Sequence, residues 1–196
     1  MAESLVPSLV PLAGWAGKPL NEMENAMTDA FVTAEISSDW ERRVAEAWAA
    51  LDSYAEDDFV RLIGELADEL PAGSAVAAFE RACAWDSTGH SDLAVPLYRQ
   101  ALETGLTGIR RRRAVIQMSS SLRNIGRADE SVVLLTAERE AGHDELDDAV
   151  AATLALALTD VGREREAVSV AIAALAPHLP RYQRSMANYA RLLVEP

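Results

Sequence analysis

Three histidines are the first residues in this sequence that could do chemistry, as metal ligands or as proton acceptors. His90, His143 and His178 each lie next to a predicted turn, 53 and 35 residues apart. His90 and His143 fall at similar ends of different repeating segments, so nothing in the spacing brings them to one site. We interpret them as surface histidines of turns rather than as catalytic or metal-binding residues.

Cys83 is the only cysteine and could act as a nucleophile. It lies in the middle of the helical segment AFERACAWD, and no base is adjacent to it. A catalytic thiol needs a neighbouring base or cation, so we interpret Cys83 as a packed or groove-facing thiol. A single cysteine also excludes an internal disulfide framework and a CxxC-type zinc site.

The acidic run at residues 144–148 (DELDD) lacks the alternating oxygen ligands and the central glycine of a calcium loop. Acidic residues are stabilised at the N-terminus of a helix, so this run predicts a helix start. The sequence contains no P-loop, GxGxxG or GxSxG motif. We therefore expect no catalytic residue, no cofactor and no metal.

Residues 110–113 are four consecutive arginines. Successive residues of a helix point about 100° apart, so the four guanidinium groups cannot all reach one ligand. One interpretation is a solvated helix start that pairs with nearby acids. The alternative is that one or two of the arginines face a groove and attract an acidic peptide.

Charge is unevenly distributed along the 196 residues, whose formal net charge is −13. Residues 1–70 carry 15 acidic and 4 basic residues, whereas residues 71–143 carry 8 acidic and 9 basic residues, a net charge of +1. An acidic chain repels polyanions, so nucleic acid and anionic membranes are excluded as partners. No apolar run reaches the roughly 18–20 residues that span a bilayer, and a cytoplasmic location is expected.

Helical spacing of apolar residues recurs from about residue 38 to the end, and no strand-like alternation is sustained. Ser38 and Glu41 predict a capping box ahead of an apolar stripe that includes Trp40 and Trp48. A second helix follows from Phe59 and ends before Pro71 and Gly73. Residues 1–37 are predicted to be a tail, partly helical or flexible, and residues 38–196 a helical domain.

Three glycine turns at Gly89, Gly126 and Gly162 repeat with spacings of 37 and 36 residues. A helical segment precedes and follows each turn, and glycine suits the left-handed conformation that ends the first helix. Such a period predicts a solenoid of three helix pairs. The segment after Pro180 predicts an amphipathic helix that caps the last pair.

The segment AFERACAWDSTGHSDLAVPLYRQALETGL resembles tetratricopeptide repeats, with the family's glycine, small residue, aromatic and alanine at Gly89, Ala94, Tyr98 and Ala101. More narrowly, residues 40–194 resemble a bacterial tetratricopeptide-repeat family through RRRAVIQMSSSLRNIGRADESVVLL and LAPHLPRYQRSMANYARLL. The resemblance implies a right-handed α-α superhelix, a protein-binding scaffold without catalytic activity, and a dimer.

Two positions depart from that consensus: Glu138 replaces the usual alanine in the second repeat, and Ala171 replaces an aromatic in the third. In such arrays the first helix of each pair lines the concave face. Alignment on the glycine turns then predicts the residues that contact a partner: Phe79, Asp86, Arg113, Ile116, Ser120, Arg123, Asn124, Leu156 and Asp160.

The sequence therefore predicts a scaffold that binds a protein or peptide, favouring an acidic segment near residues 71–143. A guanidinium and an amide at Arg123 and Asn124 suit such recognition. The competing interpretation is that these two side chains cap a helix or bridge neighbouring repeats. Trp15, Trp40 and Trp48 predict packing either on the first repeat or across a homodimer. The alternative function is an oligomerisation module, and a small-ligand sensor or enzyme is third.

Overall fold

The computed structural model describes residues 36–195, and within this range the chain is helical and forms no β-strand. The elements are α2 (Ser38–Ala49), η2 (Leu51–Ser53), α3 (Glu56–Asp68), α4 (Ala75–Ser87), α5 (Ser91–Glu103), α6 (Gly108–Asn124), α7 (Ala128–Ala141), α8 (Asp147–Asp160), α9 (Glu164–Leu175), η3 (Ala176–His178) and α10 (Gln183–Leu192). The helix suggested around Met23 and Phe31, like Trp15, lies outside the described residues.

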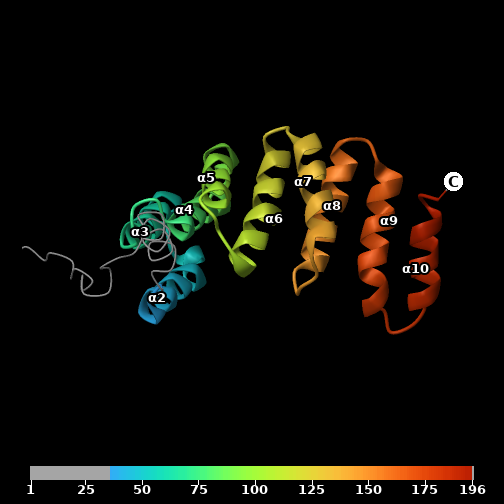
Figure 1. Cartoon of the computed structure of the whole chain (residues 1–196), viewed down its shortest axis with the longest axis horizontal. Helices are drawn as coiled ribbons and strands as arrows, with labels where there is room; N and C mark the ends of the chain where they lie inside the picture. The colour runs from blue at the N-terminus through green and yellow to red at the C-terminus, as the bar shows by residue number, and fades with distance from the viewer. Residues whose placement is uncertain (1–35, 196) are drawn as a thin grey trace, which may run out of the picture. The chain divides into compact units, whose positions relative to one another are not determined.

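Within the unit that begins at residue 42, helices α3 to α10 are stacked in chain order, and each packs on the next. Figure 1 shows α6 to α10 side by side and alternating in direction. The three predicted pairs are α4 with α5, α6 with α7, and α8 with α9. Gly89, Gly126 and Gly162 end the first helix of each pair with φ between 73° and 84°, as the glycine turns predict.

The start of α2 differs from the predicted capping box. The Trp40 amide donates to the Ser37 Oγ at 3.2 Å, and the Ser37 carbonyl accepts from the Glu41 amide. Ser37 is therefore the N-cap and Ser38 is already helical, so the predicted cap was wrong by one residue. Asp147 opens α8, which confirms that the acidic run starts a helix.

Trp48 packs inside its own chain. Its ring meets Phe59 of α3 edge to face at 5.0 Å and lies against the core of the first pair. Its indole N–H donates to the buried Glu80 carboxylate of α4 at 2.9 Å. The first of the two predicted packing sites for this tryptophan, the first repeat, is the one that the structure shows.

The apolar core of the stack is divided in two. One cluster joins α4, α5 and α6 around Phe79, Tyr98 and Leu122, and the other joins α7, α8 and α9 around Leu135 and Leu154. The division falls inside the second pair. Five buried polar residues lie in α6 and α7, and we call them the polar seam: Arg112, Ser119, Ser121, Ser131 and Glu138.

Two serines of the polar seam have no hydrogen-bond partner. Ser119 and Ser131 are fully buried, and their hydroxyls are unpaired. The residues 37 before and 36 after them are alanines: Ala82 and Ala155 for Ser119, Ala94 and Ala167 for Ser131. These positions need a small side chain, and only the second pair uses a polar one.

We expect Ser119→Ala and Ser131→Ala each to raise the free energy of unfolding by about 1 kcal/mol, because each removes an unsatisfied buried hydroxyl. Urea unfolding followed by circular dichroism measures this. Ser121→Ala is the matched control, since Ser121 is equally buried but donates to Asp86 Oδ1 at 2.6 Å. The Ser121→Ala variant gains the same helix propensity, yet its free energy of unfolding should fall because the hydrogen bond to Asp86 is lost. Equal effects at Ser119 and Ser121 would contradict the explanation.

Candidate functional site

The first helices of successive pairs share one face. α4 contacts α6 and α6 contacts α8, whereas α5 and α9 make no comparable contacts with α7. The first helices are thus closer together than the second helices, which places them on the inner side of a curved stack. The exposed side chains of α4, α6 and α8 form this inner face, which is the face predicted to bind a partner.

The structure distributes the predicted contact residues between surface and core. Phe79 is fully buried, so it cannot itself touch a partner. Half-buried residues are Asp86, Ile116, Ser120 and Arg123, and exposed ones are Arg113, Asn124, Leu156 and Asp160. Phe79 still belongs to the site, because the Arg113 guanidinium stacks over its ring at 5.3 Å.

Asp86 is held by hydroxyls from two other helices. Ser121 of α6 donates to it at 2.6 Å, and the Tyr98 hydroxyl of α5 lies 3.3 Å from its Oδ2. Burial raises the pKa of Asp86 above its ordinary value, and the two hydrogen bonds offset part of that effect. Asp86 therefore fastens α4 to its neighbours and is poorly placed to meet a partner.

Cys83 lies beside this group. Burial raises the pKa of its thiol to about 12, so the thiol stays protonated. It donates to the Gln117 Oε1 at 3.5 Å and accepts from the Tyr98 hydroxyl at 3.6 Å. The interpretation of Cys83 as a packed thiol fits this environment.

Arg123 and Asn124 bridge neighbouring pairs. The Arg123 Nε lies 2.6 Å from the Asp160 Oδ2 of α8, and the Asn124 amide donates to the Ser91 Oγ of α5 at 3.1 Å. In the structure these two side chains therefore have the bridging role that was the competing interpretation to recognition. Arg123 and Asp160 come together as an ion pair on the inner face, and the guanidinium there is already neutralised.

Three of the four consecutive arginines have acidic partners in other helices. Arg110 pairs with Glu80 of α4, and Arg111 donates to both oxygens of Glu138 at 2.6 Å. Arg112 is buried and reaches Glu138, the Gly142 carbonyl, and the carboxylates of Asp144 and Asp147. This spread in direction is what a 100° step per residue predicts.

Arg113 differs from the other three. Its guanidinium is exposed, rests on Phe79, and lies within ion-pair distance of no carboxylate in the described part of the chain. It is held in place without being neutralised. Gln117 and Ser120, four and seven residues further along α6, lie on the same side of the helix as Arg113.

The histidines take part in exposed pairs. His143 Nδ1 lies 2.9 Å from Asp147, and His178 Nε2 lies 2.8 Å from Asp148, both at the start of α8. The hydrogen bond with His143 lowers the pKa of Asp147. Among residues 36–195, no three His, Cys, Asp or Glu side chains are grouped so that they could hold a metal ion.

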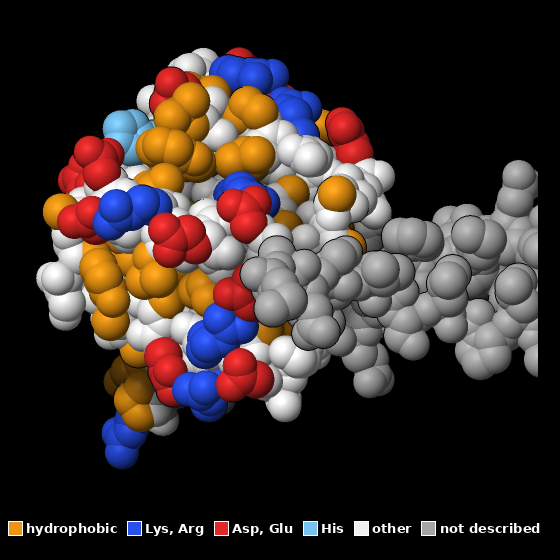
Figure 2. Space-filling view, turned by 90° about the vertical axis from the view of Figure 1, so that its left-hand side faces the viewer, with side chains coloured by type: hydrophobic (Ala, Val, Ile, Leu, Met, Phe, Trp, Pro, Cys, Tyr) orange, Lys and Arg blue, Asp and Glu red, His pale blue; other side chains and the backbone are white. Residues whose placement is uncertain are grey.

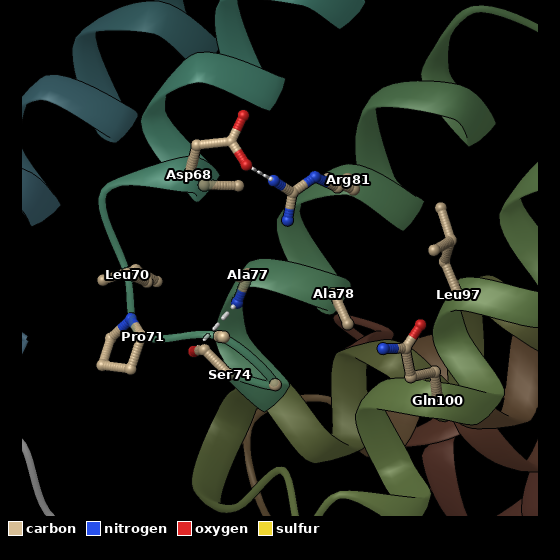
Figure 3. A pocket seen from close by; sticks show the side chains of 12 residues that line it. Asp68, Leu70, Pro71, Ser74, Ala77, Ala78, Arg81, Leu97 and Gln100 are labelled. Atoms are coloured by element: carbon tan, nitrogen blue, oxygen red, sulfur yellow. Dashed lines mark hydrogen bonds and ion pairs between the residues drawn. The ribbon is translucent and has the colours of Figure 1, made fainter.

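Away from the inner face, a cavity of about 260 Å³ lies between α3, the following loop, α4 and α5 (Figure 3). Three of its polar side chains already have partners: Arg81 donates to Asp68 at 2.5 Å, and Ser74 caps α4 by accepting from the Ala77 amide. It is smaller than the roughly 300–1,000 Å³ of typical ligand pockets. It is therefore a weaker candidate site than the inner face.

The surface at the α3 end of the stack has no dominant charge. Figure 2 shows acidic and basic side chains alternating there with apolar ones. No helix in the described range is long and apolar enough to cross a membrane.

Sequence reasoning missed three residues that shape the site: Glu80, Gln117 and Glu138. Gln117 could have been found from the repeat register, because it matches Glu80 at the 37-residue spacing. Glu138 had only its departure from the repeat consensus as a signal. The arginines that pair with Glu138 lie 26 and 27 residues away in the sequence, and no local pattern predicts them.

Stacked helix pairs with left-handed glycines at their turns define a helical-repeat solenoid. The tetratricopeptide repeat family matches residues 75–193, well over half of the sequence, and this chain belongs to that family. The crystal structure of a putative kinesin light chain with TPR-like repeats from Podospora anserina is similar in fold. The TM-score is 0.60 at 17% identity, over 79% of this chain and 90% of that one. No curated protein matches the sequence significantly.

The match confirms the predicted right-handed α-α superhelix. A protein-interaction scaffold is the general role of this repeat fold. The inner face of the curved stack is thus the concave face of the superhelix.

We expect Glu138→Ala to lower the free energy of unfolding by about 3 kcal/mol, because it leaves the buried Arg112 without its nearest buried counter-charge. Thermal and urea unfolding measure the loss. Glu140→Ala, an exposed acid on the same helix, is the matched control and should change stability by no more than about 0.5 kcal/mol. Equal small effects would show that the buried pair does not hold the second helix pair together.

Proposed function

We propose that this chain is a non-enzymatic scaffold that binds an acidic segment of a protein partner on the concave face, within a homodimer in the cytoplasm. The observation that supports acidic recognition is Arg113, which is exposed, held on Phe79 and paired with no acid among residues 36–195. A cation fixed in advance loses little side-chain entropy when a carboxylate binds.

Local charge supports the same choice. The segment from 71 to 143 carries a net charge of +1 in a chain of net charge −13, and α6 with its run of four consecutive arginines lies in it. Since long-range repulsion is largely screened beyond about 8 Å at physiological salt, the local cation decides the contact. The chain's overall acidity still opposes binding to nucleic acid or anionic lipid.

Ser120 and Ile116 are half-buried next to Arg113 on the same helix and complete the proposed contact surface of the second pair. Arg123, Asn124 and Asp160 flank it. Because their side chains already bridge helix pairs, they contribute to recognition chiefly by fixing the position of α6.

The alternative function is an oligomerisation module, in which the chain binds only itself. This alternative requires the same fold, but it gives the exposed Arg113 guanidinium no role. A small-ligand sensor or an enzyme is third. The cavity of Figure 3 offers such a ligand few unpaired polar groups.

The recognition proposal predicts the outcome of a selection with random linear peptides displayed on phage and panned against the full chain. The selected peptides should be enriched in Asp and Glu. Arg113→Ala should weaken binding of a selected peptide by about tenfold or more, since a charge-assisted hydrogen bond contributes about 1.5–3 kcal/mol. Fluorescence anisotropy with the labelled peptide measures it.

Arg139→Ala is the matched control for that variant. Arg139 is an exposed arginine of α7, a second helix of its pair, and it has no ion pair in the described structure. It should leave the affinity unchanged. Binding of the Arg113→Ala protein at wild-type strength would place recognition elsewhere, and a selection that enriches no peptide would favour the oligomerisation module.

The dimer part of the proposal has its own test. The resemblance to the narrower bacterial family supports a dimer, and exposed apolar side chains such as Tyr182 and Leu175 leave surface for one. Light scattering coupled to size exclusion should give about twice the chain mass of 21.2 kDa at micromolar concentration. A mass of one chain across the accessible concentration range would remove the dimer from the proposal.

A further inference from the structure

Three side-chain contacts join α4 to α6 on the concave side of the stack. Each contact pairs one residue of α4 with one residue of α6: Phe79 with Arg113, Cys83 with Gln117, and Asp86 with Ser121. The three α6 residues are spaced four apart, so they share one side of that helix. The middle contact therefore lies between the exposed Arg113 cation and the Asp86 carboxylate.

The middle contact uses only one end of the Gln117 side chain. The Gln117 Oε1 accepts from the Cys83 thiol at 3.5 Å, whereas its Nε2 has no hydrogen-bond partner among residues 36–195. The buried side-chain atoms without a partner in that range belong to Arg112, Ser119 and Ser131, so the Gln117 Nε2 reaches solvent. Gln117 thus presents two N–H donors on the concave face, one helical turn from Arg113.

The Cys83 thiol fixes which end of the Gln117 amide faces outward. The buried thiol stays protonated, because its pKa is raised to about 12, and it therefore has a hydrogen to donate. An amide nitrogen donates and does not accept, so the amide oxygen is the end that turns toward the thiol hydrogen. A free glutamine offers a partner either a donor or an acceptor. In this structure Gln117 offers a donor.

The charges on either side of Gln117 restrict the group that it can bind. Arg113 attracts a carboxylate, but the half-buried Asp86 carboxylate at the next contact repels one. A neutral carbonyl accepts from the Gln117 amide without that repulsion. Glu80, the other acid on this part of α4, is buried and pairs with Arg110, so it does not alter this choice. The arrangement favours a carboxylate at Arg113 and a neutral acceptor at Gln117.

We infer that Gln117 donates to a main-chain carbonyl of the same acidic segment that Arg113 binds, and that Cys83 is the residue that positions it. This inference rests on the proposed function. Arg113 and Gln117 are four residues apart, which is a rise of about 6 Å along α6. An extended chain advances about 3.3 Å per residue, so the carbonyl lies about two residues from the acidic side chain. Every residue of an extended segment supplies such a carbonyl, and no further side chain is required.

A peptide from the phage selection against the full chain tests the donor. Gln117→Met keeps a side chain of similar length without the N–H donors, and it should weaken binding about fivefold, the effect of one neutral hydrogen bond. Fluorescence anisotropy measures the affinity. Gln100→Met, at an exposed glutamine of α5, is the matched control and should bind the peptide as wild type does.

A series of the same peptide with single peptide bonds replaced by esters tests the acceptor, because an ester carbonyl is a weaker acceptor than an amide carbonyl. One ester, about two residues from the acidic side chain, should weaken binding to the wild-type protein. The same ester should cost nothing further on the Gln117→Met protein, where the donor is already absent.

Cys83→Ala tests the positioning role. Without the thiol the Gln117 amide turns freely, so the fraction that faces a partner with its nitrogen falls and binding should weaken about twofold to threefold. In the Gln117→Met protein, Cys83→Ala should have no further effect, because Cys83 acts only through that side chain. Val95→Ala, in the same apolar cluster but on α5, is the matched control for lost core volume and should leave the affinity unchanged. Circular dichroism checks that each variant folds.

Wild-type affinity of the Gln117→Met protein would overturn the inference. An equal loss from Cys83→Ala in both backgrounds, or an ester series without such a position, would also overturn it. In each of these cases a loss of binding by Arg113→Ala leaves the proposed function standing. A selection that yields no binding peptide overturns both. If Gln117→Met changed the light-scattering mass from dimer to monomer, this face would bind a second copy, and the inference would be wrong.

Discussion

The buried pair of Arg112 and Glu138 is the interaction on which the rest of the stack depends. It lies in the second helix pair, where the apolar core gives way to the polar seam, so it joins the two clusters that the seam separates. Taking two charges out of water is costly, and the pair is stable only because further groups satisfy it. Arg111 forms a second ion pair with the Glu138 carboxylate, and Asp144 and Asp147 pair with the Arg112 guanidinium. The chain thus uses a carboxylate at Glu138, where the other two pairs have Ala101 and Ala174.

The same network determines which cation remains for a partner. Four consecutive arginines point in four directions, and three of the directions meet acids on α4, α7 and the start of α8. The fourth lies over the Phe79 ring, and no acid of the described residues is within ion-pair distance of it. The availability of Arg113 for a partner is therefore a consequence of how the second pair is held together. A rotation of α6 by one residue would exchange the structural and the available arginine.

The sequence predicts the fold well because its determinants are local. Three features can be read from the sequence alone: glycine at a helix end, small residues at the helix contacts and a 36–37-residue period. Together they predict the helices and their pairing. The partners of charged side chains are not visible in this way. Arg123 and Asp160 are both polar residues on predicted concave positions, yet their separation of 37 residues becomes 2.6 Å only after the pairs have stacked. Phe79 aligns with partner-facing positions, yet it packs in the core of the first pair beside Tyr98, and Arg113 lies over its ring.

An acidic chain that is proposed to bind an acidic segment needs an explanation, and the distribution of its charge supplies one. The net charge of −13 comes mainly from residues 1–70, whereas residues 71–143 carry a net charge of +1. Charges more than about 8 Å away are largely screened at physiological salt, so the distant acids weaken the contact little. Arg113 of α6 is held over the Phe79 ring inside the segment of net positive charge, and it meets an approaching carboxylate directly. A single guanidinium gives a weak attraction, so specificity must come from the neighbouring side chains of the concave face, whose positions the stacked helix pairs fix.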